Sequence, residues 1–407
     1  MDPLTHTLVG AALAETRLAR LGRAAELPRA VAATTLVIGA NLPDVDVACY
    51  FVGSDFALAH RRGWTHGVLA MVVLPVLLTL IVGGLRAAAA RRRRTGGRPV
   101  PSPASPGTGW RPLLALSAIG VWSHPLLDWL NTYGVRLLAP FDWTWFYGDA
   151  LFIADPWIWL LLAGALFLGR SRSVGAIAAW ALTATAVTAL VLLAAPAAAR
   201  IAWGLALVLL VLARFRGPLS RTGARRVATA AVAAAGLYVA AMIGSTALGR
   251  RVARQGGEAA EPGARVEAVM AGPVAANPFR REVVTRIGDG YRLGTIRWRA
   301  GGPVLELAPG TVSGPSPGPL ARRALESPAV RGMRTWMRFP TFVTEPAGDG
   351  RVRVHIVDLR YARRPASGFG TASVVLEPRV RSLSDPGAGG GLDEDLVLRD
   401  VVEEPVP

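Results

Sequence analysis

Residues 122–134 read WSHPLLDWLNTYG and place a histidine and a carboxylate inside one of the most apolar parts of the chain. His124 and Asp128 are four residues apart, so on a helix both lie on one face, within reach of a single metal ion. Pro125 predicts that a membrane helix breaks near Ser123 and restarts at the proline. A polar pair in lipid is costly unless it is paired, hydrated or metal-bound, so the stretch marks a candidate functional site. The alternative is a kinked helix whose two polar side chains bond to each other or to their neighbours.

The histidines of the chain are not scattered. Four of the five lie in its first third, where several aspartates accompany them. Histidines that only fill a core have no reason to gather in this way, so the grouping favours one shared site. The candidate metal ligands are His6, Asp44, His60, His66, His124 and Asp128, with Asp46 beside them.

The composition indicates a multi-pass membrane protein. Hydrophobic residues make up 52% of the 407 positions, and several uncharged runs approach the length that crosses a bilayer. The net charge of +17 is carried by arginines between the apolar segments, where membrane topology explains them better than nucleic-acid binding does. Cys49 is the only cysteine, which excludes an internal disulfide and a cysteine metal cluster.

Two stretches before residue 50 carry candidate ligands. At the start, Asp2 is expected to cap a short membrane helix with His6 near its N-terminal end. Further on, Pro43 predicts a turn that presents the carboxylates of Asp44 and Asp46. Two acids in a turn are good oxygen ligands, and they are also ordinary capping residues.

The box HRRGWTH, residues 60–66, adds two histidines and two arginines. Histidines six residues apart do not share a helix face, so they converge on one ion only if Gly63 lets the chain turn. Arg61 and Arg62 are expected to bind a phosphate or carboxylate of the substrate. The alternative is a pair of interfacial arginines with an interfacial Trp64.

These motifs together resemble the membrane-bound metal-dependent hydrolases typified by the LexA-regulated inner-membrane hydrolase of enteric bacteria. The resemblance rests on DPLTH (2–6), LPDVD (42–46), HRRGWTH (60–66), and SHPLLDWLNTYG (123–134) followed by LLAPFDWTWFYGDALFIADPW (137–157). It covers roughly the first 160 residues, and several ordered motifs are more specific than any one alone. It implies a membrane protein with a His/Asp metal centre and hydrolase activity. The family commonly has a shorter HRG-x-TH box. Because of the extra arginine here, the resemblance supports His66 as a ligand more than it supports His60.

The arginine runs predict the topology. If the Arg91–Arg94 run lies in the cytoplasm, alternation of the segments puts the other arginine runs inside, with Arg200 as the exception. The same alternation places all the candidate ligands at the outer ends of their helices, which the charge rule did not require. We therefore expect the site on the extracytoplasmic side of the bacterial cytoplasmic (inner) membrane, near the lipid headgroups.

The chain is expected to comprise an all-α multi-pass membrane domain of about seven or eight helices, followed by a small β-rich soluble domain. The helical domain would span residues 1–249, with the metal site within 1–160 and a basic disordered loop at 86–111. Strands are expected at 287–299, 339–345, 351–361 and 371–376 of an extracytoplasmic domain at 250–384. An acidic, Gly-rich tail, 385–407, is expected to be flexible.

The favoured mechanism is metal-assisted hydrolysis, in which a divalent ion, expected to be zinc, lowers the pKa of bound water and stabilises the oxyanion. The candidates exceed the needs of one zinc, so one or two ions are expected. Asp46 would bridge or lie in the outer shell, and Asp149 or Asp155 would act as a base or an outer-shell partner. The expected substrate is an ester or phosphoester of a membrane lipid or lipid-linked molecule, since the site lies at headgroup depth beside two arginines.

Two other classes stay open. A non-enzymatic membrane protein would use the metal to tie helix ends together and its β-rich domain to bind a partner. A transporter would place ionisable groups near the bilayer midplane, often in repeated halves, and neither feature is visible in the sequence. No nucleic-acid partner is expected, and the sequence identifies no protein partner.

Overall fold

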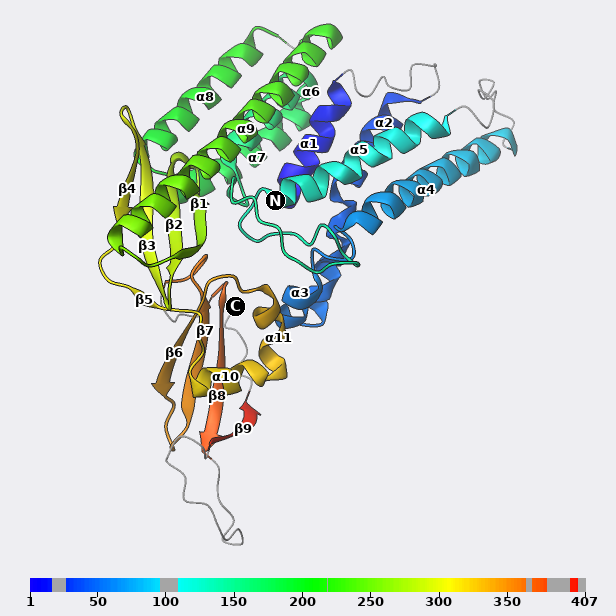
Figure 1. Cartoon of the computed structure of the whole chain (residues 1–407). Coiled ribbons are helices and arrows are strands. Elements are labelled where there is room, and N and C mark those ends of the chain that lie inside the picture. Colours follow the sequence, from blue (N-terminus) through cyan, green and yellow to red (C-terminus); the bar gives the residue numbers. More distant parts are fainter. Residues whose placement is uncertain (17–26, 96–108, 218, 364–367, 379–395, 402–407) are drawn as a thin grey trace, which may run out of the picture. The chain divides into compact units, whose positions relative to one another are not determined.

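The computed structural model describes residues 1–16, 27–95, 109–217, 219–363, 368–378 and 396–401, which form two units (Figure 1). The first unit comprises residues 1–46 and 62–247 together with 273–279. The second comprises 47–61, 248–272 and the described residues from 280 onward. Each unit therefore includes a short segment that is embedded in the sequence of the other.

The first unit is helical, in agreement with the apolar segments of its sequence. Its helices are α1 (Pro3–Glu15), α2 (Arg29–Asn41), α4 (Val68–Thr95), α5 (Trp110–Trp129), α6 (Pro156–Arg170), α7 (Val174–Ala194), α8 (Ala197–Phe215) and most of α9 (Arg221–Ala260). The 3-10 helix η2 (Leu42–Phe51) continues α2. The last residues of α9, from Leu248, and of η2, from Val47, belong to the second unit. Helix α1 packs between α2 and α6, and α5 packs between α2 and α4. Helices α7 and α8 pack against α6 and against each other.

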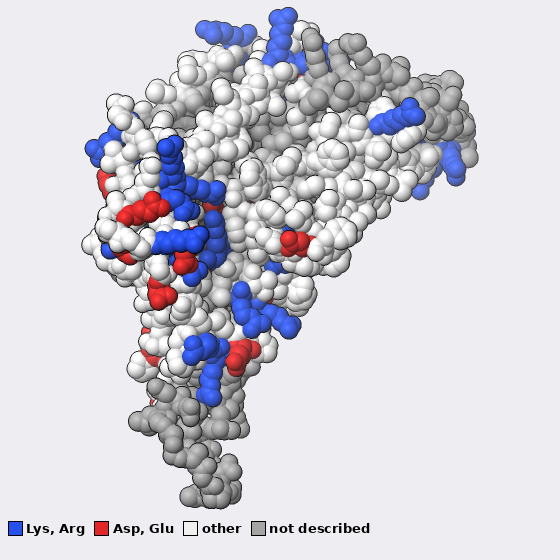
Figure 2. Space-filling model, viewed as in Figure 1, with Lys and Arg blue, Asp and Glu red and all other residues white. Residues whose placement is uncertain are grey.

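Five candidate membrane spans occur among the described residues, judged by their length and composition. They are Arg29–Phe51, Val68–Arg92, Val174–Ala194, Ala197–Phe215 and Arg221–Ala260. Helices α1 and α6 have 13 and 15 residues, which is less than the roughly 20 that a bilayer requires. The expected count of seven or eight membrane helices is not confirmed. On the face shown in Figure 2, the surface over the helices is almost uncharged, and arginines gather at helix ends.

Glycine allows α2 and α5 to approach closely. A Cβ atom on Gly39 would lie 3.1 Å from the Cα atom of Gly120, and a Cβ on Gly120 would lie 2.9 Å from the carbonyl oxygen of Leu36. Small residues at a helix interface permit this approach in membrane proteins. The contact aligns the C-terminal halves of α2 and α5, which both carry residues of the site described below.

The second unit contains two antiparallel sheets. The first has strand order β1 (Val266–Val274), β2 (Asn277–Ile287), β3 (Gly290–Arg299) and β4 (Gly302–Leu307), with β5 (Val312–Ser313) also paired to β3. The second has the order β6 (Pro340–Pro346), β7 (Val352–Asp358), β8 (Thr371–Pro378) and β9 (Leu396–Val401). The β-rich character that the sequence predicted after the helices is confirmed.

Three short helices complete the second unit: α3 (Ser54–His60), α10 (Pro319–Glu326) and α11 (Arg331–Trp336). Helix α3 packs against α11. The carboxylate of Asp55 accepts hydrogen bonds from the backbone N–H groups of Gly332 and Met333, at 2.8 and 3.0 Å. These bonds satisfy donors that the start of a short helix leaves without intrahelical partners. They attach the segment 47–61 to the second unit.

The observed strands refine the expected ones. The stretch from Ile287 to Arg299 was expected to be one strand, but a turn at Gly288 and Asp289 separates β2 from β3, and Gly288 has φ of 52°. The strands expected at 339–345 and 371–376 correspond to β6 and β8. The strand expected at 351–361 corresponds to β7, which ends at Asp358.

Two segments expected to lack structure contain ordered elements. Helix α4 continues through Thr95 and carries the arginine run, so the basic loop expected from residue 86 does not begin there. Within the tail expected to be flexible, Leu396–Val401 forms β9 and pairs with β8 across an irregularity between Val375 and Glu377. The remaining parts of that loop and of that tail, 96–108, 385–395 and 402–407, lie outside the described residues.

Candidate metal centre

Helix α1 brings the first ligand candidate to the site. Asp2 caps the helix by accepting from the backbone N–H of Thr5 at 3.0 Å, and Pro3 occupies the first turn, as the sequence predicted. His6 lies one turn into the helix and is fully buried. Its ring stacks on that of His124, with centroids 3.7 Å apart. Its Nε2 atom lies 3.3 Å from Oδ1 of Asp128.

The end of α2 and the start of η2 supply two carboxylates. The expected turn at Pro43 is a 3-10 helix, and Leu42 keeps helical angles, φ −59° and ψ −38°. The chain therefore continues at Pro43 as a tighter 3-10 helix and does not leave the helical conformation, because proline is tolerated in the first turn of a helix. Asp46 is buried, whereas 18% of the Asp44 side chain is exposed.

The turn between α3 and α4 supplies a cation and a second histidine. Arg62, and not Gly63, takes the left-handed conformation, with φ of 56°. Gly63 is required for space, because a Cβ there would lie 2.7 Å from the Trp143 ring. The turn leaves His66 fully buried just before α4, and Arg62 is 4% exposed.

Helix α5 supplies His124 and Asp128 from one face, as their spacing predicted. The helix does not break at Ser123: it runs from Trp110 to Trp129 with Pro125 inside it. Proline removes only one backbone donor, and a packed helix in a membrane protein tolerates that loss. Both side chains are fully buried.

These side chains form one compact cluster. Asp44, His66, His124 and Asp128 each present a ligand atom, and the four atoms lie within 4.8 Å of one another. The Nε2 atoms of His66 and His124 are 3.1 Å apart. Oδ2 of Asp128 lies 3.2 Å from Nε2 of His66 and 3.6 Å from that of His124, and Oδ1 of Asp44 lies 3.6 Å from Nε2 of His124. Ligands about 2.1 Å from a tetrahedral zinc ion are about 3.4 Å from one another, so the cluster has the dimensions of a metal site.

Both histidines are oriented by bonds to their other ring nitrogens. Nδ1 of His124 lies 2.7 Å from the carbonyl oxygen of Ala40, so this nitrogen carries the proton and Nε2 offers a lone pair. Nδ1 of His66 lies 2.8 Å from Oγ1 of Thr65, whose hydroxyl donates to Oδ2 of Asp46 at 2.9 Å. Such partners commonly fix the orientation of metal-binding histidines.

Arg62 closes the cluster on the side of Asp128. Its Nε atom lies 3.2 Å from Oδ2 of that aspartate, and its backbone N–H donates to Oδ2 of Asp46 at 2.8 Å. Nη1 donates to Oδ1 of Asn131 and to the carbonyl oxygen of Gly134, both at 3.2 Å. Arg62 thus stabilises two buried carboxylates, Asp128 with its guanidinium and Asp46 with its backbone N–H.

Several groups that contact the cluster were not predicted from the sequence. They are the hydroxyl of Thr65, the amide of Asn131, the carbonyl of Ala40 and the amino group of Met1, which contacts Asp128. Thr65 and Asn131 lie within the quoted motifs WTH and LNTYG, so adjacency to the ligands was the available signal. The carbonyl of Ala40 could not be predicted, because every residue has a backbone carbonyl and the residue type does not show which one will bind a histidine.

Four predicted site residues make other contacts. The ring of His60 stacks on that of Phe56, and Nδ1 of His60 lies 2.9 Å from the backbone carbonyl oxygen of Phe56. The guanidinium of Arg61 lies over the ring of Tyr50. Asp155 caps α6 and accepts a hydrogen bond from the hydroxyl of Tyr238 at 2.9 Å. Asp149 is buried, and its carbonyl oxygen accepts from Thr246 at 3.0 Å.

The remaining histidine, His355, lies on β7 and pairs with Glu345 on β6, at 2.9 Å. Its hydrogen bond lowers the pKa of Glu345 below the ordinary value. This interaction belongs to the second sheet.

Comparison with known proteins supports the membrane assignment. Residues 1–202 match the family model described as YdjM inner membrane protein. No curated protein and no solved structure matches the chain. The matched range contains every residue of the cluster and supports the inner-membrane part of the resemblance noted from the motifs. Its description names neither a metal nor a reaction.

Proposed function

We propose that the chain is an inner-membrane metal-dependent hydrolase in which His66, His124, Asp44 and Asp128 hold a divalent ion, zinc in the first instance. The observation that carries this proposal is the pair of Nε2 atoms 3.1 Å apart, with each ring's Nδ1 engaged elsewhere. Two lone pairs directed at one point beside two carboxylates are a donor set suited to zinc. When bound, the ion would supply a water of lowered pKa and stabilise a developing oxyanion.

The chain's own residues have distinct roles in this proposal. Asp46 and Thr65 orient His66, and the carbonyl of Ala40 orients His124. Arg62 balances the charge of Asp128. Asp44 is the ligand candidate with an exposed edge, so substrate would enter beside it. His6 contacts the other oxygen of Asp128 and is the candidate for a second ion, with that carboxylate as the bridge.

The proposed substrate is an ester or phosphoester of a membrane lipid or lipid-linked molecule. The cluster is built from the N-terminal ends of α1 and α4 and the C-terminal ends of α2 and α5, so it lies at one end of the helical unit. Trp64 and Trp143 are 57% and 41% exposed near this end and contact each other edge to face. Exposed tryptophans are typical of the membrane interface, where headgroups lie.

Burial of the ligands favours one competing function, a structural metal site in a non-enzymatic protein. His66, His124 and Asp128 have no exposed surface. Structural zinc sites are closed by protein ligands, whereas catalytic ones keep an open position. The β-rich unit would then bind a partner. The two functions differ in whether the loaded protein turns over a substrate.

The test of the proposal is metal analysis of the purified protein combined with hydrolysis assays. We expect about one equivalent of zinc, or about two if His6 takes part. The loaded protein should hydrolyse at least one member of a panel of phospholipids, lipid phosphates and lipid-linked esters, and activity should be lost on chelation and return with metal. Protein purified without metal that also binds none on titration would refute the metal centre.

Sidedness is a separate proposal with its own experiment. The arginine run at the far end of α4 lies about 35 Å along the helix from the cluster, and such runs favour the cytoplasm. In a Cys49→Ala background, Gly96→Cys should react only with reagents on the cytoplasmic side, and Gly301→Cys only with reagents outside. A Cβ on Gly301 meets nothing within 4 Å, so that substitution leaves the sheet intact. Labelling of both sites from one side would contradict the proposed alternation.

A further inference from the structure

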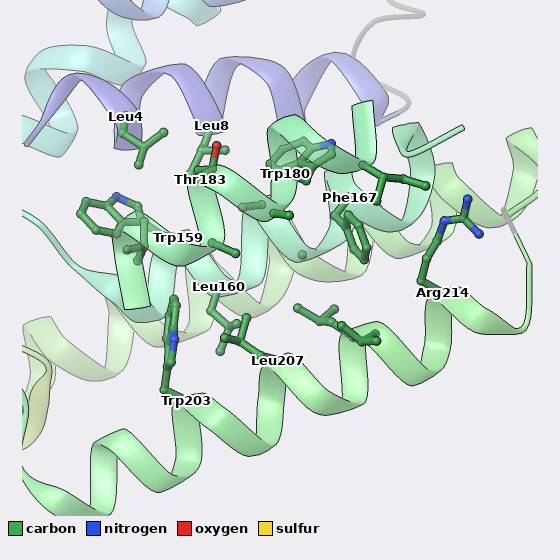
Figure 3. A pocket seen from close by; sticks show the side chains of 18 of the residues that line it. Leu4, Leu8, Trp159, Leu160, Phe167, Trp180, Thr183, Trp203, Leu207 and Arg214 are labelled. Carbon is green, nitrogen blue, oxygen red and sulfur yellow. The ribbon is translucent and has the colours of Figure 1, made fainter. Parts of the chain in front are cut away.

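An apolar cavity of about 410 Å³ lies among α1, α6, α7 and α8, apart from the metal centre (Figure 3). Helix α1 separates the two, because Leu4 and Leu8 line the cavity whereas His6 belongs to the cluster. The volume is within the usual range of small-molecule sites, about 300–1,000 Å³. Nothing in the proposed hydrolysis uses this cavity.

Three polar side chains in the walls, Trp159, Trp203 and Thr183, use their donors within the protein. The indole N–H groups of Trp159 and Trp203 donate to Thr5 at 2.8 Å and to Thr188 at 3.0 Å. The hydroxyl of Thr183 donates to the carbonyl of Ala179 in its own helix, at 2.9 Å. A ligand in the body of the cavity therefore contacts apolar surface, which suits a hydrocarbon chain.

One end of the cavity is cationic. Arg214, near the C-terminus of α8, lies at this end in Figure 3. Its Nε donates to Oγ of Ser171 at 2.8 Å, and its Nη2 donates to the backbone carbonyl oxygen of Ser171 at 2.6 Å. These two bonds fix the orientation of the guanidinium. In the part of the chain that the structure describes, these contacts leave Nη1 for a ligand. A fixed guanidinium suits the planar recognition of a phosphate.

The cavity is accessible from the lipid phase. Helices α7 and α8 are both candidate membrane spans. The lining residues Ile177, Val211 and Phe215 are 40%, 48% and 83% exposed. A lipid chain can therefore enter sideways, with its headgroup at the end where α8 finishes.

We propose that this cavity binds one acyl chain of an anionic membrane phospholipid, whose phosphate contacts Arg214. Selectivity comes from the headgroup, because an apolar chain gains little on leaving a bilayer for an apolar cavity. The lipid is a resident ligand and not the substrate, since α1 separates the cavity from the metal centre.

The probe is phosphatidylglycerol with a photoreactive group in one acyl chain, applied to the full chain in phosphatidylcholine nanodiscs. Crosslinks should map to the cavity-lining residues of α6, α7 and α8. The same group carried on phosphatidylcholine should label about tenfold less. Both lipids have a phosphate, but the choline cation of phosphatidylcholine offsets the phosphate charge and is repelled by Arg214. Equal labelling by the two lipids would overturn the proposal.

Two pairs of variants locate the site. Ala184→Trp fills the cavity, whereas Ala186→Trp adds the same bulk to an exposed position of α7 that does not line it. The first should abolish labelling by phosphatidylglycerol, and the second should leave it unchanged. Arg214→Gln should lower that labelling to the phosphatidylcholine level, and Arg216→Gln should not.

Metal content and elution volume report whether each variant is folded. Unchanged labelling of a folded Ala184→Trp or Arg214→Gln variant would overturn the proposal. If either variant does not fold, the comparison of the two lipids on the unmodified chain still decides.

Discussion

Replacing His66 or His124 with alanine is expected to abolish stoichiometric zinc binding. Each ring supplies one of the two Nε2 atoms that lie 3.1 Å apart, so either change leaves the ion with one nitrogen and two carboxylates. We expect the metal content to fall from about one equivalent to below about a tenth, because loss of one imidazole leaves an oxygen-rich donor set that suits zinc less well. Inductively coupled plasma analysis of the purified variants gives the measurement.

His60→Ala is the matched control for His66→Ala. The two histidines belong to the same HRRGWTH box, but His60 stacks on Phe56 and is exposed. We expect His60→Ala and His355→Ala to keep the full metal content. Normal zinc in both the His66 and the His124 variant would refute the site, and so would loss of zinc in His60→Ala with retention in His66→Ala. His66→Gln tests whether a folded protein with similar side-chain volume also loses the ion.

The sequence predicted which His and Asp side chains gather in the cluster better than it predicted the groups that orient them. His124 and Asp128 are linked by a helical repeat, and a periodic pattern is the most readable feature of a sequence. Within the HRRGWTH box, by contrast, spacing alone did not separate His66 from His60 or Arg62 from Arg61. The difference arises from the left-handed Arg62 and from Trp143, which packs on Gly63 from 80 residues further along. Long-range packing of this kind leaves no local signal.

The outcome for Asp155 has a similar physical origin. An acid before a proline and an apolar run is equally compatible with a helix cap and a catalytic base, and the structure shows the cap. In the same way, the arginine run of residues 91–94 predicted a loop, but α4 continues through it. Arginine is a good helix former, so charge marked the membrane boundary without marking the end of the helix.

The second unit was harder to predict than the first. Its strands were expected where alternation is strong. The strands β1, β4, β5 and β9 were not expected, and neither was β2 apart from Ile287 at its end. The inclusion of 47–61 in this unit was also not expected. It depends on Asp55, whose carboxylate caps α11 nearly 280 residues later in the chain.

Asp46→Asn is expected to keep the metal and the fold but lose turnover. Asn can place its carbonyl oxygen where Oδ2 of Asp46 accepts from Arg62 and Thr65, at 2.8 and 2.9 Å, so the local bonds survive. The negative charge behind His66 is lost, and an outer carboxylate of this kind strengthens the histidine as a ligand and tunes the ion. We expect zinc affinity to weaken by about 10- to 100-fold and kcat to fall by about the same factor or more, with KM unchanged.

The control for this change is Asp142→Asn, an exposed aspartate that accepts only from Thr144 in the described contacts. It should leave zinc content, kcat and the thermal midpoint unchanged. The Asp46 variant also distinguishes a catalytic role of the metal centre from a structural role, because a structural metal contributes directly to folding.

If the role is structural, chelation should unfold the helical unit, and Asp46→Asn should lower the thermal midpoint. The unmodified protein, refilled with metal, should then cleave no member of the panel. If the site is catalytic, chelation should remove activity reversibly while the helices persist by circular dichroism, and Asp46→Asn should reproduce that loss of activity with the zinc still bound.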